Sequence, residues 1–163
     1  MRKIKVEALT KEAFAPFGEY YAFEAPEGYP LTGELHRFFP DRLTLATNGL
    51  LALSPILVKK PAEMKVTQIE YHTTTAEVIM PLNDDMILHA APPSAGKPIP
   101  EYTKAFLVPK HTAVRLNPCV WHLAPLPANA AELCALIVLP SCTYINDCTV
   151  VDLKEDEQFT IVK

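Results

Sequence analysis

The chain has 163 residues, of which 49% are hydrophobic and 21% are charged. These proportions are typical of a globular domain and exclude a disordered chain, so we expect one domain over residues 1–163. The net charge is −4 and the basic residues are scattered, which excludes a stripe that neutralises phosphates. We therefore expect no nucleic-acid partner.

The apolar runs are all short. None approaches the roughly 20 residues of a membrane span, and none of signal-peptide length follows the basic start. We expect a cytoplasmic protein without a membrane partner. The four cysteines include no Cys-x-x-Cys pair, so in a reducing compartment they are expected to be thiols and not zinc ligands.

The chain has sixteen prolines and only five glycines, and this proline content predicts short elements and few helices. One helix is expected at residues 11–15, where Thr10 is a plausible N-cap and Pro16 ends the helical run. The following segment 24–40 is rich in Pro, Gly and Tyr, and is expected to be a long loop.

Short apolar or alternating runs with the length and composition of strands follow that loop. They cover residues 50–53, 64–69, 77–80, 86–88, 104–108, 112–116 and 133–139. The turn at 83–85 predicts a hairpin between the third and fourth runs. The last run is the most continuously apolar, which is typical of a strand buried on both faces. Many short strands separated by turn residues favour a β-sandwich or barrel over βαβ units.

Two carboxylates and an imidazole lie within eight residues, at Glu70, His72 and Glu77, and His122 lies far downstream. Residues two apart on a strand point to the same face, so Glu70 and His72 can face together while Glu77 returns from a neighbouring strand. A divalent metal in a barrel mouth takes three or four such ligands from different strands. Two carboxylates with two neutral imidazoles also balance a 2+ charge.

A plainer interpretation of the same residues stays open. In it, Glu70 and Glu77 are solvent-facing charges at strand ends, and the histidines only hydrogen-bond backbone carbonyls. His36, His89 and His111 have no partner spacing that indicates chemistry.

A set of motifs along nearly the whole chain resembles a known family. The motifs are Leu9–Gly18, Glu70-Tyr71-His72 with Glu77 and Met80-Pro81, Lys104-Ala105-Phe106, Val120-Trp121-His122 and Asn146-Asp147-Cys148. The Glu-x-His-x4-Glu pattern with the later Trp-His pair resembles the two motifs of cupins. The whole set, in this order, resembles the ureidoglycolate lyase family.

That resemblance implies an all-β fold: a cupin-like antiparallel β-barrel, or double-stranded jelly roll, with one or few short helices. It also implies a homodimer, and we expect the two copies to pair through edge strands because barrels of this size often do.

The implied reaction eliminates urea from ureidoglycolate and leaves glyoxylate. It needs a base, an acid and a cation for the substrate carboxylate. His72 or His122 is the expected base, or a ligand of a divalent metal held by Glu70, His72, Glu77 and His122, and Glu77 is the expected proton shuttle.

Four further residues are candidate substrate contacts, each with a structural alternative. Lys104 or Arg115 is expected to hold the carboxylate, unless both lie on a solvated strand face. Asn117 can donate a hydrogen bond to the carboxylate or open a turn, and Trp121 can stack on the ligand or pack in the barrel wall.

Two other functions stay open on such a scaffold, because fold alone does not select a reaction. One is a non-catalytic cupin that binds a small acid or a sugar, and the other is a cupin isomerase.

Overall fold

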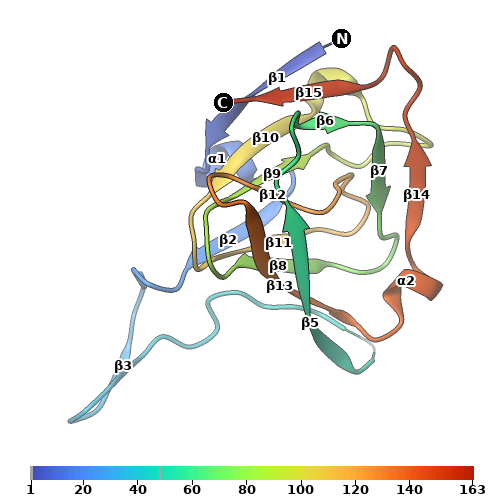
Figure 1. The fold of residues 1–163 in the computed structure, drawn as a ribbon. Helices are drawn as coiled ribbons and strands as arrows, with labels where there is room; N and C mark the ends of the chain where they lie inside the picture. The colour runs from blue at the N-terminus through green and yellow to red at the C-terminus, as the bar shows by residue number, and fades with distance from the viewer. Residues whose placement is uncertain (1, 48) are drawn as a thin grey trace.

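Two β-sheets form the body of the structure, a computed structural model that describes residues 2–47 and 49–163. In spatial order, the six-stranded sheet contains β12 (Leu126–Pro127), β9 (Met86–Ala90), β10 (Lys104–Val108), β1 (Arg2–Ala8), β15 (Phe159–Val162) and β6 (Lys65–Val66). The five-stranded sheet contains β2 (Gly18–Ala22), β11 (Thr112–Leu116), β8 (Glu77–Pro81), β13 (Glu132–Pro140) and β5 (Leu51–Lys59). Figure 1 shows how they curl around a common interior.

The remaining elements are small. Two strand pairs stand apart from the sheets, β7 (Gln68–Tyr71) with β14 (Thr149–Asp152) and β3 (Leu31–Thr32) with β4 (Arg37–Phe38). The helical segments are α1 (Lys11–Phe14), α2 (Thr143–Asn146) and the 3-10 turn η1 (Pro100–Tyr102). In the described residues, no helix has the length and apolar character needed to cross a membrane.

The expected all-β fold with few short helices is confirmed. One strand departs from the antiparallel arrangement, because β1 runs parallel to both of its neighbours, β10 and β15. The expected helix is also confirmed as α1, and its cap is Thr10, whose hydroxyl accepts a hydrogen bond from the Ala13 N–H at 3.1 Å.

The hairpin predicted around residues 83–85 is wrong. β8 pairs with β11 and β13, whereas β9 pairs with β10 and β12, so the turn carries the chain from one sheet to the other. Distant backbone groups hold that crossing. The Asp84 carboxylate accepts from the Asn129 and Ala130 N–H groups at 2.7 Å each, and the Asp85 carboxylate accepts from the Lys110 N–H at 2.8 Å.

The expectation that the run 133–139 is buried on both faces is wrong for one face. Alternate residues of β13 are buried in the interior, while those between them are only half-buried on the outer face of the five-stranded sheet. β5 alternates in the same way, with its outward residues exposed.

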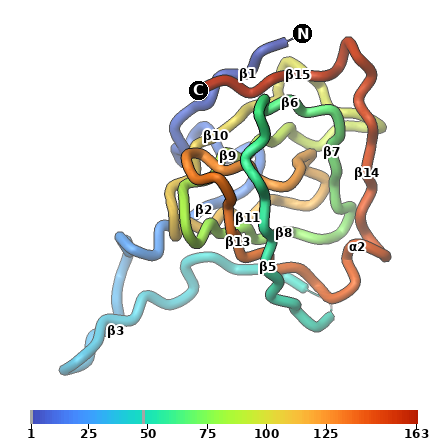
Figure 2. Tube along the Cα trace, viewed as in Figure 1, coloured from blue at the N-terminus to red at the C-terminus, as the bar shows by residue number. Residues whose placement is uncertain are grey.

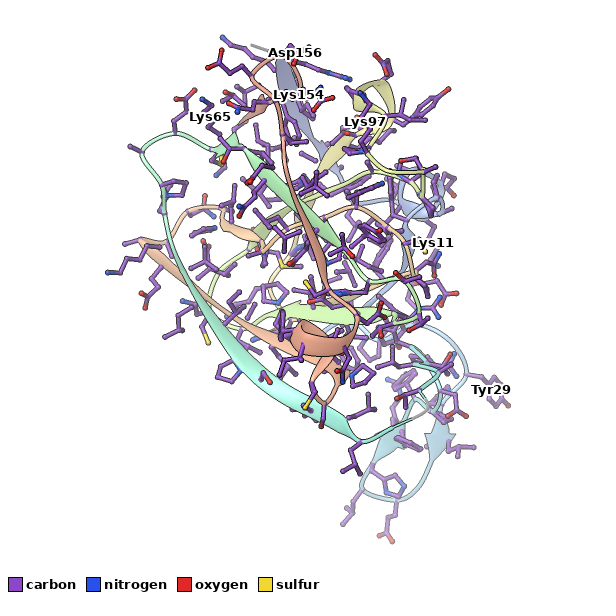
Figure 3. All side chains as sticks on the ribbon, turned by 90° about the vertical axis from the view of Figure 1, so that its right-hand side faces the viewer. Lys11, Tyr29, Lys65, Lys97, Lys154 and Asp156 are labelled. Carbon is purple, nitrogen blue, oxygen red and sulfur yellow. The ribbon has the colours of Figure 1, made fainter. Side chains whose placement is uncertain are left out.

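The segment expected to be a long loop projects from the body. It carries the short pair β3 and β4, and we call residues 29–38 the arm. Figures 1 and 2 show the arm extending away from both sheets, and Figure 3 shows Tyr29 on it, far from the main body of side chains.

Aromatic packing fills the interior between the sheets. Phe14 of α1, Phe17 and Phe106 of β10 are at most 2% exposed and pack against one another, with ring centroids 5.3 to 5.9 Å apart. This contact joins α1 to the six-stranded sheet and closes one side of the core.

Removing the central ring of this group is therefore expected to be costly. Phe106→Ala should lower the free energy of unfolding by about 3–5 kcal/mol, because the ring's transfer energy is lost and a cavity remains. Urea denaturation measures the change. Tyr102→Ala, which truncates a side chain that is 59% exposed, should stay within about 0.5 kcal/mol of the parent. Equal effects for the two variants would contradict the assignment of the core.

Candidate functional site

Four side chains from separate parts of the chain converge at one end of the interior. Glu70 lies on β7, His72 follows that strand, Glu77 begins β8 and His122 lies in a short segment beside β7. Reciprocal backbone hydrogen bonds join Glu70 and His122, at 2.7 and 2.9 Å. These four are the residues that the sequence analysis gave as candidate metal ligands, and the structure brings them together.

Glu77 is the centre of this cluster. The alternation of β8 turns Glu77 inward together with Ile79, so the carboxylate is buried with the core. One oxygen, Oε2, lies 2.8 Å from His122 Nε2 and 3.2 Å from His72 Nε2. A single carboxylate oxygen is therefore shared between two imidazoles.

The far nitrogen of each imidazole is fixed by the backbone. His72 Nδ1 lies 2.7 Å from the carbonyl oxygen of Asp147, and His122 Nδ1 lies 2.9 Å from that of Val120. A carbonyl only accepts, so both Nδ1 atoms carry hydrogen. Each neutral ring then presents an Nε2 lone pair to the Glu77 oxygen. Three electron-rich atoms meet, and either protons or a cation must lie among them.

The electrostatics of the cluster favour charge separation. Burial works to raise the pKa of Glu77, but the hydrogen bonds from His122 and His72 lower it to about 2. Burial works to lower the pKa of each histidine, but the hydrogen bond and the charge of Glu77 raise it in both. Glu77 is therefore a buried carboxylate that stabilises positive charge on its two neighbours.

Glu70 completes a set of ligand atoms around the same point. One atom each from Glu70, His72 and His122 lie within 4.8 Å of one another. Ligands that share an ion through bonds of about 2 Å lie about 3–4 Å apart, and Glu70 Oε1 lies 3.9 Å from His122 Nε2. Nitrogen and oxygen donors with fixed outer hydrogen bonds suit such an ion.

Cys148 contacts Glu70, one of these candidate ligands. Its thiol donates to Glu70 Oε2 at 3.4 Å. Burial, followed by the charge of Glu70, raises the pKa of Cys148 to about 11, so the sulfur stays protonated and positions the carboxylate instead of attacking a ligand.

A cavity of about 210 Å³ adjoins the cluster. Apart from Glu70, Glu77 and His122, its lining is apolar or aromatic: Ile56, Ile79, Leu123, Ala124, Pro125, Ile137 and Tyr144. Burial, with the charges of Glu77 and Glu70, raises the pKa of Tyr144 to about 12, so it is a phenol at neutral pH. No lysine or arginine is among the described residues that line this cavity.

Asp147 holds the loop that carries His72. Its carboxylate accepts from the N–H groups of Thr73 and Thr74 at 2.7 and 2.9 Å, and from the hydroxyls of Thr74 and Thr75 at 2.8 and 2.7 Å. Burial works to raise the pKa of Asp147, but these bonds, the Thr75 hydroxyl first, lower it to about 2. Asp147 thus fixes the loop with its side chain and His72 with its carbonyl.

The four predicted substrate contacts lie outside the cluster. Lys104 pairs with Glu7 at 3.3 Å. Arg115 points to the outer face of the five-stranded sheet, where it contacts Glu19 at 3.1 Å and Asn117 at 3.3 Å. Trp121 donates to the Ser94 hydroxyl at 2.9 Å and is buried in the wall. Their structural alternatives describe these contacts better.

Tyr144, Asp147 and Cys148 were not assigned roles from the sequence. Asp147 and Cys148 appear there only as part of a family motif, and the apolar positions around Tyr144 gave no signal of chemistry. The hydrogen bonds that join Asp147 to the His72 loop and Cys148 to Glu70 span 72 to 78 residues, which no local spacing encodes.

Comparison with known proteins gives a consistent result. The family model described as "Ureidoglycolate lyase" matches residues 1–161. The ureidoglycolate lyase of Pseudomonas paraeruginosa is 26% identical over 99% of this chain and 96% of its own length. That of Burkholderia cepacia is 30% identical over 79% of this chain and 75% of its own. A solved chain of Bacillus subtilis oxalate decarboxylase, titled for its Mn(II) centres, gives a TM-score of 0.45 at 12% identity, covering 77% of this chain and 30% of that one. No conclusion follows from a likeness that slight.

Removing the Asp147 carboxylate should loosen the loop that carries His72. Asp147→Ala is expected to lower the free energy of unfolding by about 1–3 kcal/mol, since it leaves four donors without their charged acceptor. It should also speed hydrogen exchange at the amides of Thr73 and Thr74. Asp156→Ala is the matched control, because Asp156 lies on the exposed turn between β14 and β15, at the opposite end of β14 from α2 (Figure 3). Unchanged hydrogen exchange in Asp147→Ala would contradict the role of Asp147 in holding this loop.

Proposed function

The chain belongs to the ureidoglycolate lyase family, and from that premise we propose that it cleaves ureidoglycolate to glyoxylate and urea. In this elimination the hydroxyl loses a proton and becomes the glyoxylate carbonyl, while the carbon–nitrogen bond breaks and the departing urea nitrogen takes up a proton. No net proton is consumed. The reaction therefore needs a base and an acid that exchange one proton at the same place.

One observation carries the proposal: Glu77 Oε2 lies within hydrogen-bond distance of both Nε2 atoms. Because each Nδ1–H is held by a backbone carbonyl, proton exchange is confined to the Nε2 side, where the carboxylate lies. A proton accepted at one imidazole can pass through Glu77, so base and acid are coupled through a single oxygen.

The lining of the cavity supports a division of these roles. His122 and Glu77 both line it, whereas His72 lies behind Glu77. We assign His122 Nε2 as the base for the substrate hydroxyl and Glu77 as the carrier that returns the proton to the departing nitrogen. His72 keeps Glu77 ionised and oriented.

In the alternative to direct proton transfer, Glu70, His72, Glu77 and His122 would hold a divalent cation, and the Nε2 atoms, as its ligands, would then not act as bases. When bound, it supplies positive charge for the substrate carboxylate and lowers the pKa of the hydroxyl. This proposal rests on charge: the cavity presents two carboxylates, and no lysine or arginine among its described lining offsets them. An anionic substrate needs a positive partner there.

We also propose a cellular location, a pathway and an oligomeric state for the chain. The four cysteines are unpaired in the described structure, which suits the reducing conditions of the cytoplasm. Ureidoglycolate cleavage places the chain in the degradation of allantoin and other purine products. The active species is proposed to be a homodimer.

Variants of the two histidines test the chemistry. His122→Ala and His72→Ala are each expected to lower the rate of urea release from ureidoglycolate by about 10²–10⁴-fold, because each removes a proton-exchange partner. Their circular dichroism spectra should match the parent. His36→Ala, on the exposed arm, is the matched control and should keep full activity. If both cluster variants turn over normally, the assignment fails; if the parent only binds glyoxylate without turnover, the protein is a binder.

Metal content tests the cation independently of turnover. After removal of bound metal by a chelator, the parent should take up about one Mn²⁺ or Zn²⁺ ion per chain, measured by calorimetry and elemental analysis. Glu70→Ala should weaken that affinity at least about 10-fold, since it removes one ligand. Glu132→Ala, which truncates an exposed carboxylate at the end of β13, is the control. Uptake that is the same in Glu70→Ala would place the ion elsewhere.

A further inference from the structure

The cavity beside the cluster has one wall that is purely apolar. Glu77 and Ile79 are successive inward residues of β8. Ile137 of β13 lies opposite Ile79, and Ile56 of β5 lies diagonally across from Ile137. All four line the cavity, and we call the three isoleucines the isoleucine wall. The inner face of the sheet therefore changes, within one step along β8, from a carboxylate to an apolar surface.

The backbone behind this wall is already bonded. β8 and β13 are inner strands of the five-stranded sheet, and Ile79 and Ile137 each have a paired residue on both sides. Their N–H and C=O groups belong to the ladders. The lining residues Leu123, Ala124 and Pro125 also have apolar side chains. In the described lining, a polar ligand group at the wall therefore meets no side chain that bonds it.

The proposed reaction decides which part of the substrate meets the wall. One carbon of ureidoglycolate carries the hydroxyl, the carboxylate and the departing nitrogen, so all three lie on the side of Glu70, Glu77 and His122. This holds whether or not a cation is bound there. The carbonyl and the terminal amino group extend away from that carbon, toward the rest of the lining. The amino group has two N–H donors, and the isoleucine wall offers them no acceptor.

Tyr144 is the one polar side chain in the rest of the described lining. It is a phenol at neutral pH, so its hydroxyl has a hydrogen to donate. That hydroxyl suits the carbonyl oxygen next to the departing nitrogen, and it does not satisfy both N–H groups of a terminal amino group as well. The cavity is therefore suited to an amide carbonyl that is followed by an apolar group.

We propose that the chain also cleaves N-acetyl-α-hydroxyglycine, the acid in which a methyl group replaces the terminal amino group of ureidoglycolate. The two acids have the same number of non-hydrogen atoms and the same reacting carbon. The methyl group fits the isoleucine wall better, because it buries apolar area and leaves no donor unpaired. This inference rests on the proposed lyase function and extends its substrate class to small N-acyl-α-hydroxyglycines.

The bond changes are those of the ureidoglycolate reaction. The hydroxyl loses its proton and its carbon–oxygen bond becomes the aldehyde of glyoxylate. The carbon–nitrogen bond breaks, and its electron pair goes to the nitrogen. That nitrogen takes up one proton and leaves as acetamide. No oxidant, water or other co-reactant is consumed, so the acid and base needed for ureidoglycolate are sufficient.

The volume of the cavity agrees with a ligand of this size. An apolar protein cavity of about 150 Å³ holds benzene. The cavity here has about 210 Å³, which is room for a small acid with an acetyl group.

Rates of glyoxylate release from the two acids test the proposal, because glyoxylate is their common product. A site built to bond a substrate N–H rejects an analogue without it by about 10⁴–10⁵-fold, whereas an apolar pocket separates near-isosteres by at most about 200-fold. Each kcat/KM is divided by the uncatalysed rate constant of the same compound. The value for N-acetyl-α-hydroxyglycine should then be at least about one tenth of that for ureidoglycolate.

Two substitutions of Ile56 provide a matched comparison within the wall. Ile56→Thr and Ile56→Val shorten this half-buried side chain alike, but only threonine adds a hydroxyl. The preference for the acetyl compound should be about 3- to 10-fold lower in Ile56→Thr than in Ile56→Val, because the hydroxyl accepts from the amino group of ureidoglycolate. Ile99→Thr, at an exposed residue outside the cavity, should keep the preference of the parent.

The possible results separate this inference from the proposed function. Glyoxylate release from neither acid contradicts the lyase function. Release from ureidoglycolate alone, or a ratio below one tenth, overturns the wider substrate class and leaves the lyase function intact. Release from the acetyl compound alone supports the wider class and contradicts ureidoglycolate as the substrate. Equal preferences in Ile56→Thr and Ile56→Val overturn the role of the isoleucine wall. If Ile56→Thr does not fold, the two rates of the parent decide.

Discussion

Burial of the Glu77 carboxylate between two imidazoles is the constraint on which the rest of the site depends. An isolated buried carboxylate is costly, and here two hydrogen bonds to one oxygen compensate for the lost water. The backbone carbonyls of Asp147 and Val120 fix the rings so that those bonds form. The surrounding strands therefore support a charged group that a plain hydrophobic core would exclude.

Strand alternation explains how the sequence places that group. Glu77 occupies an inward position of β8, beside Ile79, so the rule that buries the core also buries the acid. The short strands and the shared face of Glu70 and His72 were readable from the sequence because period-two spacing is local information, whereas His122 was found through its place in a family motif. Which strands share a sheet was not readable. The turn after β8 crosses between sheets because Asp84 and Asp85 bond to backbone groups after β12 and β10.

The substrate contacts were the least predictable part of the site. Lys104 and Arg115 have the charge that a carboxylate ligand requires, but each lies next to an acid of its own, which nothing in its neighbouring sequence indicates. Conversely, Tyr144 and Cys148 meet the cluster through the fold of the chain after β13. Residue type suggested chemistry, and only tertiary contact decided which residues were placed to perform it.

The position of β1 between two parallel strands affects how the chain folds during synthesis. Its two parallel neighbours, β10 and β15, come from the middle and the late part of the chain. During synthesis, β1 leaves the ribosome long before either neighbour exists. Its residues 6–8 stay unpaired until β10 has been made, and its residues 2–5, with the inward Ile4, stay unpaired until β15 has been made. The six-stranded sheet can close only after translation has passed residue 162, and such non-local parallel pairing makes folding slow.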